Sequence, residues 1–176
     1  YAVSSSNASA MGAFDNRTGG WYEEFFTRIG YPMEMLPEIY DENANYGETT
    51  AFGVPIPITG AIADQQASLF AQNCRTPGTA KCTNGTGTFM DINIGEKAAK
   101  APQGLDLMAA WTIDGKTEYM FEGMMGVTGS AVQWLRDGLG IIQTSAETET
   151  LALSVPDTNG VYFVINLAGA WVPRYD

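Results

Sequence analysis

The sequence has 176 residues, of which 45% are apolar and 16% charged, a composition typical of globular proteins and unlike that of disordered or fibrous ones. Twenty acidic residues against nine basic ones give a net charge of -11, which would repel a nucleic-acid backbone. No apolar run approaches the ~18 residues that cross a bilayer, so we expect neither nucleic acid nor a membrane as a partner.

The first predicted unit in chain order is a strand, a turn and a helix. Residues 11–15 are predicted to be a strand, and residues 21–29 a helix, because their apolar side chains share one helical face. Residues 33–53 show no sustained period and predict a surface connection. Residues 54–59 contain alternating prolines, which favour an extended segment.

The next segment, residues 64–72, has the pattern of a helix. Asp64 lies near its amino end, where the helix dipole favours a carboxylate. Residues 73–78 include Pro77 and Gly78, which break the helical pattern. We therefore place a domain boundary between residues 72 and 73.

Two strand pairs follow the predicted boundary. Residues 80–83 and 89–94 are predicted strands joined by a tight turn, because the turn's glycines permit positive φ. Residues 107–113 and 117–121 flank an Asp-Gly pair, which is a strong hairpin signal.

The last third of the chain predicts helices and one more strand. Residues 126–139 have a helical period, and Gly129 and Gln133 lie one turn apart within them. Residues 147–154 predict a short helix, and residues 161–167 a buried strand. This mixture of elements indicates an α/β architecture.

Histidine is absent, and Cys74 and Cys82 lack the spacing of a zinc site or a disulfide framework. We interpret both cysteines as reduced thiols of a cytoplasmic protein. Without histidine the usual Ser-His and Cys-His nucleophile pairs cannot form in this segment. Its chemistry must therefore rest on carboxylates, hydroxyls, amides and backbone groups.

Four motifs follow one another along the chain. They are Ala-Asp-Gln-Gln-Ala-Ser-Leu-Phe at 63–70, Asn-Gly-Thr-Gly-Thr-Phe-Met at 84–90, Gly-Ser-Ala-Val-Gln-Trp-Leu-Arg-Asp at 129–137 and Asp-Thr-Asn-Gly-Val-Tyr-Phe-Val at 157–164. In this order and spacing the chain resembles the FGGY family of carbohydrate kinases, and within it the kinases that act on glycerol.

The resemblance implies a ribonuclease H-like α/β fold of the actin and hexokinase type, with two domains that close over a cleft. Residues 1–72 would end the first domain and residues 73–176 would begin the second. The chain would then be an internal segment of a longer enzyme and inactive alone. The full-length enzyme is expected to be a cytoplasmic homo-oligomer.

The activity that the resemblance implies is ATP-dependent phosphorylation of glycerol to glycerol 3-phosphate, with ATP and Mg²⁺ as cofactors and no metal ligand in this segment. Two alternatives stay open. One is an FGGY kinase for another polyol or sugar, such as erythritol, xylulose or a sugar acid. The other is a homologue that binds without catalysis.

The resemblance also assigns the polyol side of the site. Asp64 would be the catalytic base that accepts the hydroxyl proton, and it would contact the polyol together with Gln65 and Phe89. Taken from the residues alone, Asp64 would be an ordinary helix cap, Gln65 an exposed first-turn residue and Phe89 a buried strand residue.

Phosphate binding is assigned to the turn at Gly85, Thr86 and Gly87. Its glycines would let backbone N–H groups approach phosphate oxygens, and the Thr86 hydroxyl would add a donor. A plain hairpin turn is the alternative. By the resemblance, the helix side that carries Gly129 and Gln133 borders the nucleotide.

Overall fold

The computed structural model describes residues 1–170, and these form two compact units. Unit 1 contains Tyr1–Lys81, Asp91–Pro102 and Asp106–Glu122, and unit 2 contains Cys82–Met90, Gln103–Leu105 and the described residues from Gly123 onward. The predicted domain boundary between residues 72 and 73 stays a prediction.

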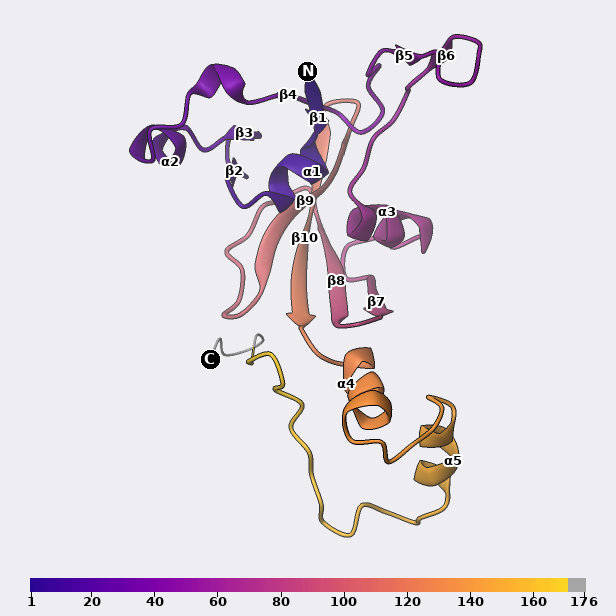
Figure 1. The fold of residues 1–176 in the computed structure, drawn as a ribbon. Helices are drawn as coiled ribbons and strands as arrows, with labels where there is room; N and C mark the ends of the chain where they lie inside the picture. The colour runs from indigo at the N-terminus through magenta and orange to yellow at the C-terminus, as the bar shows by residue number, and fades with distance from the viewer. Residues whose placement is uncertain (171–176) are drawn as a thin grey trace. The chain divides into compact units, whose positions relative to one another are not determined.

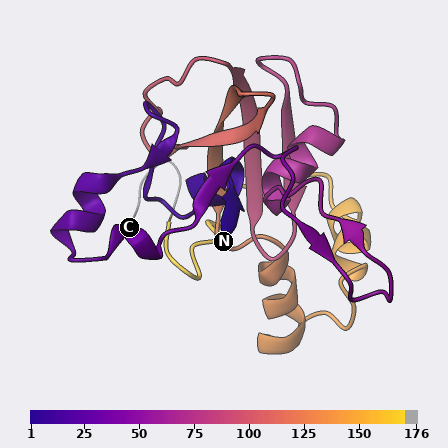
Figure 2. The ribbon, with the colours of Figure 1, turned by 90° about the horizontal axis from the view of Figure 1, so that it is seen from above.

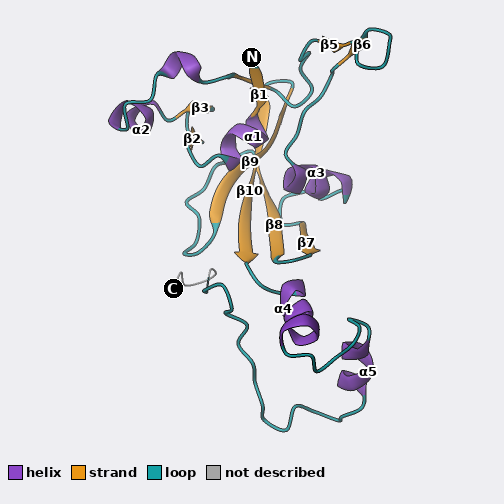
Figure 3. Cartoon of the chain, in the orientation of Figure 1, coloured by secondary structure: helices purple, strands orange, loops and turns teal. Residues whose placement is uncertain are grey.

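The largest sheet has four strands in the order β7-β8-β10-β9 (Figures 1 and 3). The strands β9 and β10 pair antiparallel, with Ile113 opposite Lys116. Between them Asp114 and Gly115 have φ of 51° and 74°, the left-handed pair that a two-residue hairpin needs. Both predicted strand pairs are confirmed as β7 (Ala80–Asn84), β8 (Thr88–Gly95), β9 (Asp106–Ile113) and β10 (Lys116–Met125).

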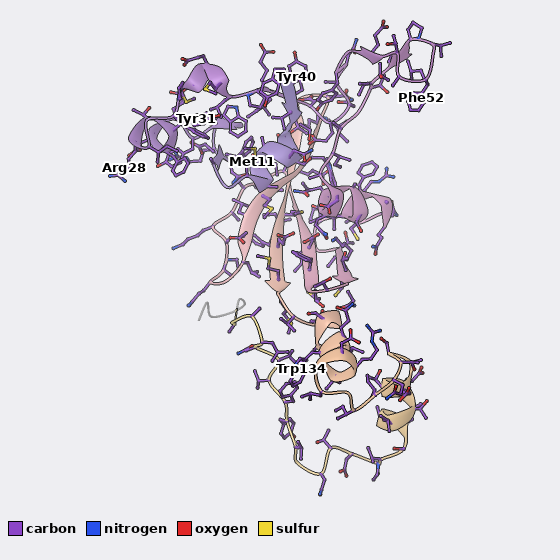
Figure 4. All side chains as sticks on the ribbon, in the orientation of Figure 1. Met11, Arg28, Tyr31, Tyr40, Phe52 and Trp134 are labelled. Carbon is purple, nitrogen blue, oxygen red and sulfur yellow. The ribbon has the colours of Figure 1, made fainter. Side chains whose placement is uncertain are left out.

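The first half of unit 1 is built from short elements. The predicted strand, turn and helix at its start are confirmed in shortened form, and the extended segment contains a strand. Phe52, labelled in Figure 4, lies in the loop between β5 and β6 and is 78% exposed. These elements are β2 (Phe14–Asp15), β3 (Gly20–Trp21), α2 (Glu23–Arg28), η1 (Met33–Met35), β5 (Glu48–Thr49) and β6 (Ile56–Pro57).

The parallel pairing of two short strands near the start of the chain was not predicted. The strand β1 (Ala2–Ser4) pairs with β4 (Glu38–Tyr40), and α1 (Ser5–Ala10) follows β1 directly. The prediction of a plain surface connection over residues 33–53 is therefore wrong where β4 and β5 lie. Strands of three residues are too short to show the alternation of apolar and polar residues that predicts a strand from sequence.

The core of unit 1 lies between α3 (Asp64–Ala71) and the sheet (Figure 2). Leu69 is fully buried and packs with Trp111 and Met120, while the Phe70 ring meets the Trp111 ring edge to face at a centroid distance of 5.2 Å. The predicted helix over residues 64–72 is confirmed, and its apolar side is what holds it on the sheet.

One buried carboxylate links the segment after β4 to α1 and β9. The Glu42 side chain accepts hydrogen bonds from the Ser5 hydroxyl, from the Ser6 N–H at 2.8 Å and from the Thr112 N–H. A buried charge that accepts several hydrogen bonds avoids most of its desolvation cost. This network sets where α1 lies, and α1 in turn contacts the segment before α3.

Unit 2 contains α4 (Gly129–Gln133), which continues as the π-helical turn η2 (Trp134–Gly138), and α5 (Glu147–Leu153). The predicted helix over residues 126–139 begins three residues late, because the Thr128 N–H bonds to the Thr86 carbonyl at 3.0 Å and its φ is -140°. The predicted helix over residues 147–154 is confirmed.

The predicted buried strand over residues 161–167 is wrong. No strand forms there in the part of the chain that the structure describes, and Tyr162 and Val164 are 88% and 74% exposed. A strand must pair its backbone N–H and C=O groups with a neighbour, and no described strand lies beside this segment. Phe163 stacks on Trp134 (labelled in Figure 4), with a ring centroid distance of 6.0 Å.

None of the helices within residues 1–170 combines the length and apolar character needed to cross a membrane.

Candidate functional site

Asp64 is the first residue of α3 and its side chain is exposed. The helix start is anchored, because the Ala63 N–H donates to the Ser6 hydroxyl at 3.0 Å and Leu69 is buried in the core. One Asp64 oxygen accepts the Gln65 N–H at 2.8 Å, but the N-cap position is Ala63 and no side chain caps the helix. The carboxylate is thus held at a rigid helix end and still faces outward.

Gln65 is half-buried, and its side chain does not simply extend into solvent. The Lys81 ammonium donates a hydrogen bond to Gln65 Oε1. This contact joins the second residue of α3 to β7. The alternative of an exposed first-turn glutamine is therefore not what the structure contains.

Lys81 is the centre of a buried charged cluster. Its Nζ lies 2.6 Å from Asp91 Oδ2, and both side chains have 0% exposure. Neither Asp91 oxygen accepts a hydrogen bond of regular geometry within residues 1–170. The ion pair, at a charge-assisted distance, is therefore the main interaction that offsets the burial of Asp91.

Glu122, on β10, is the third member of the cluster and is also buried. Burial and, next to it, the neighbouring Asp91 carboxylate together raise the pKa of Glu122 from 4.5 to about 7, against a smaller opposing effect of Lys81. With Glu122 protonated, one ammonium faces one carboxylate. The cluster then carries no net charge, which lowers the free-energy cost of burying it.

In unit 2 the turn at residues 85–87 is seated against the start of α4. The carbonyl oxygens of the turn accept hydrogen bonds from the start of α4. The Gly85 oxygen accepts the Gly129 N–H at 3.0 Å, and the Thr86 oxygen accepts the N–H and the hydroxyl of Ser130 at 3.1 and 3.0 Å. The first N–H groups of α4 are thereby satisfied by the turn. They are not available to a ligand.

Two other N–H groups of the turn are unpaired, one at the exposed Thr86 and one at the buried Gly87. Within residues 1–170 neither the Thr86 N–H nor the Gly87 N–H donates a hydrogen bond to another residue. Adjacent unpaired N–H groups form the kind of concavity that binds an anion. Phosphate binding by this turn stays a prediction.

Glycine is required at two positions of this seat. A Cβ on Gly87 would lie 2.5 Å from the Met125 carbonyl oxygen, and a Cβ on Gly129 would lie 2.2 Å from the Gly85 carbonyl oxygen. Both distances are shorter than any side chain tolerates. The backbones of turn and helix can approach this closely only because the side chains are missing.

The other predicted site residues have less defined surroundings. Phe89 is half-buried on β8. Gln133 is exposed at the end of α4, one turn from Gly129, so the two positions share one side of that helix. Their roles stay predictions.

Sequence reasoning missed Lys81, Asp91 and Glu122. A signal was present, since Asp91 and Asn93 alternate along β8 at positions that point to one face, and both are fully buried. Polar residues at core-facing positions of a strand call for partners.

Within residues 1–170 no group of three or more His, Cys, Asp or Glu side chains could hold a metal ion.

Comparison with known proteins matches residues 80–176 to the model of the FGGY family of carbohydrate kinases, C-terminal domain. The chain is 48% identical over 178 residues to a glycerol kinase of Rhodopirellula baltica, which covers 100% of the chain and 33% of the relative. It is 48% identical over 174 residues to a glycerol kinase of Thermus thermophilus, and the match covers 97% of this chain and 35% of that relative. The chain thus spans about a third of the length of these curated relatives.

Among solved structures the chain is similar to Plasmodium falciparum glycerol kinase with ADP, with a TM-score of 0.88, 33% identity, and 98% of this chain and 35% of that chain covered. A ligand-bound xylulose kinase from Lactobacillus acidophilus has a TM-score of 0.85 at 18% identity, covering 99% of this chain and 36% of that chain, and shows the fold alone. The predicted α/β fold of sugar kinases of the actin and hexokinase type is confirmed.

Proposed function

The chain belongs to the FGGY family of carbohydrate kinases, and from this we propose that the protein containing it transfers the γ-phosphoryl group of ATP to glycerol, giving glycerol 3-phosphate. The observation that carries the proposal is the extent of the likeness: 48% identity to a glycerol kinase continues over the whole chain. The xylulose kinase neighbour shares the fold at 18% identity.

Asp64 is proposed as the general base. Phosphoryl transfer to an alcohol needs a carboxylate that accepts the hydroxyl proton as the new O–P bond forms. An exposed carboxylate at an anchored helix start meets the geometric need, because the group is rigid in position and open to a substrate.

Gln65 and Phe89 are proposed to bind the polyol. The amide of Gln65 can hydrogen-bond a hydroxyl group, and the ring of Phe89 offers an apolar surface for the carbon backbone. Both side chains are half-buried, so each retains a part that a small ligand can reach.

The turn at residues 85–87 is proposed to hold phosphate oxygens. The unpaired N–H groups of Thr86 and Gly87, with the Thr86 hydroxyl, can donate to charge that develops on the transferred group. Gly129 and Gln133 are proposed to border the nucleotide, and Gly129 also seats the turn.

ATP is the proposed phosphoryl donor, and the similar structure with ADP supports this. Mg²⁺ is proposed to accompany ATP and to neutralise phosphate charge. No described residue is assigned to the metal, because no suitable group of ligands is present among residues 1–170.

A cytoplasmic location is proposed on the two cysteines, which are free thiols in the structure. A homo-oligomeric full-length enzyme stays a prediction from the resemblance.

The test is a substrate panel with the complete protein that contains this chain. ADP release is measured with ATP and glycerol, erythritol, xylulose or gluconate. We expect kcat/KM to be highest for glycerol by at least about tenfold, the scale on which a fitted pocket separates close analogues. A higher value for another acceptor would favour the sugar-kinase alternative, and no turnover with any would favour a binding homologue.

A further inference from the structure

Lys81 carries a charge that the fold has removed from water. Its side chain has 0% exposure, and a lysine is almost never fully buried unless it is paired. Its partners here include the Asp91 carboxylate and the Gln65 amide oxygen. Since replacing a buried ion pair by apolar residues is often neutral or stabilising, stability gives no strong reason for the pair.

The contact with Lys81 determines which end of the Gln65 amide is available. An ammonium group has three donors and no acceptor, so it can face only the Oε1 atom of Gln65. The Nε2 group is then directed away from Lys81. A ligand that approaches this half-buried side chain meets an N–H donor.

We propose that Lys81, held in place by Asp91, is a positioning residue that orients Gln65 so that its amide N–H donates to a hydroxyl oxygen of the polyol. This inference rests on the proposed function, since it names how one residue of that site is held. Lys81 itself does not touch the substrate. It acts through Gln65.

The third group of the cluster agrees with this role. A protonated Glu122 can donate to Asp91, which lacks regular hydrogen bonds, and this leaves Lys81 directed at Gln65 without a second negative charge to compete for it. The contact of the Lys81 ammonium with the Gln65 amide is thereby favoured over an arrangement in which Lys81 lies between two carboxylates, Asp91 and Glu122.

The test is the variant Lys81→Met in the complete protein, with steady-state kinetics for both substrates. We expect the KM for glycerol to rise by about tenfold, the loss of roughly one oriented hydrogen bond, while the KM for ATP stays within about twofold. In a Gln65→Ala background, Lys81→Met should change the KM for glycerol no further, because contacting pairs are non-additive.

Two variants separate positioning from folding. Lys81→Met combined with Asp91→Asn removes both members of the ion pair, so the Asp91 carboxylate is not left without its ammonium partner, and the double variant should show the same rise in the KM for glycerol. Phe26→Leu removes a buried ring of the same unit that packs against Trp21 and Tyr31, and it should lower stability without changing the KM for glycerol.

An unchanged KM for glycerol in a folded Lys81→Met enzyme, or equal effects of Lys81→Met with and without Gln65, would overturn the inference while the proposed function stands. If the wild-type enzyme phosphorylates another polyol instead, the same cycle is measured with that polyol. Absence of turnover by the wild type on every acceptor would overturn the proposed function and this inference with it.

Discussion

The Gly129 N–H donates to the Gly85 carbonyl oxygen at 3.0 Å, and a methyl group at position 129 would lie 2.2 Å from that same oxygen. Turn and helix are therefore joined by a contact that leaves no room for a side chain. Together with the bonds from Thr128 and Ser130 to the Thr86 carbonyl oxygen, this contact holds the turn in place.

Gly129→Ala is expected to weaken nucleotide use. The added carbon must push the Gly85 carbonyl away, which shifts the turn and its N–H groups. We expect kcat/KM for ATP to fall by at least about tenfold, since small displacements of positioned groups have large effects on rate. Kinetics at saturating glycerol with varied ATP measure this.

Gly20→Ala is the matched control, because it adds a methyl group in another hairpin of the chain. A Cβ there would lie 3.7 Å from the Thr18 hydroxyl oxygen, which is ordinary contact. It should leave kcat/KM for ATP unchanged. Equal effects of Gly129→Ala and Gly20→Ala would contradict the role given to the turn.

Asp64→Asn is expected to lower kcat by a factor on the order of 10² to 10⁴, the usual contribution of a general base. The amide has nearly the shape of the carboxylate and cannot accept the proton. The KM for glycerol should change far less than kcat. Steady-state kinetics of the complete protein give both values.

Glu23→Gln provides the comparison for Asp64→Asn. Glu23 is also an acidic residue in the first turn of a helix, α2, so its loss tests the general effect of removing such a charge. Activity should remain at the wild-type level. Retained kcat in Asp64→Asn would remove Asp64 from the mechanism.

Glu122→Gln is expected to remove a pH dependence of stability between pH 4.5 and about 7. Burial raises the pKa of Glu122 to about 7 in the folded protein, from 4.5 for the free group. In this window the unfolded chain has lost the proton and the folded protein retains it. The unfolded state binds fewer protons, so the free energy of unfolding falls as pH rises.

The size of the loss is about 3 kcal/mol, because a pKa shift from 4.5 to about 7 corresponds to 1.36 kcal/mol for each pKa unit. Glutamine keeps a donor for Asp91 and does not titrate, so the variant should be more stable than wild type at pH 8 and similar to it at pH 4.5. Thermal unfolding midpoints across this range measure the difference. The exposed Glu96→Gln should keep the wild-type slope, and an unchanged slope in Glu122→Gln would contradict the assignment.

Leu69→Ala is expected to lower the free energy of unfolding by about 2–5 kcal/mol, the range for a leucine removed from a packed core. Leu69 is fully buried against Trp111 and Met120, and α3 would lose its main contact with the sheet. Denaturant unfolding measures the change. Leu151→Ala, at a side chain 54% exposed, should cost far less, and a similar cost at both positions would argue against this core.

Local patterns made much of the fold predictable. The Asp114-Gly115 turn needs residues that tolerate positive φ, and neighbouring residues alone supply that requirement. The helix over residues 64–72 follows from its own period. The strand prediction for residues 161–167 was wrong for the opposite reason. Their apolar residues favour a strand, but a strand forms only beside another strand with which it can pair its backbone groups.

The sequence by itself determined the family, through four motifs in order, and with it Asp64, Gln65 and the glycine turn as candidates. Only the tertiary structure decided that Lys81 is buried with Asp91 and bonded to Gln65, and that the carbonyls of the turn are paired while two of its N–H groups are not. These are contacts between residues far apart along the chain, and the energy of a buried charge depends on which groups the fold brings around it, which no local pattern records.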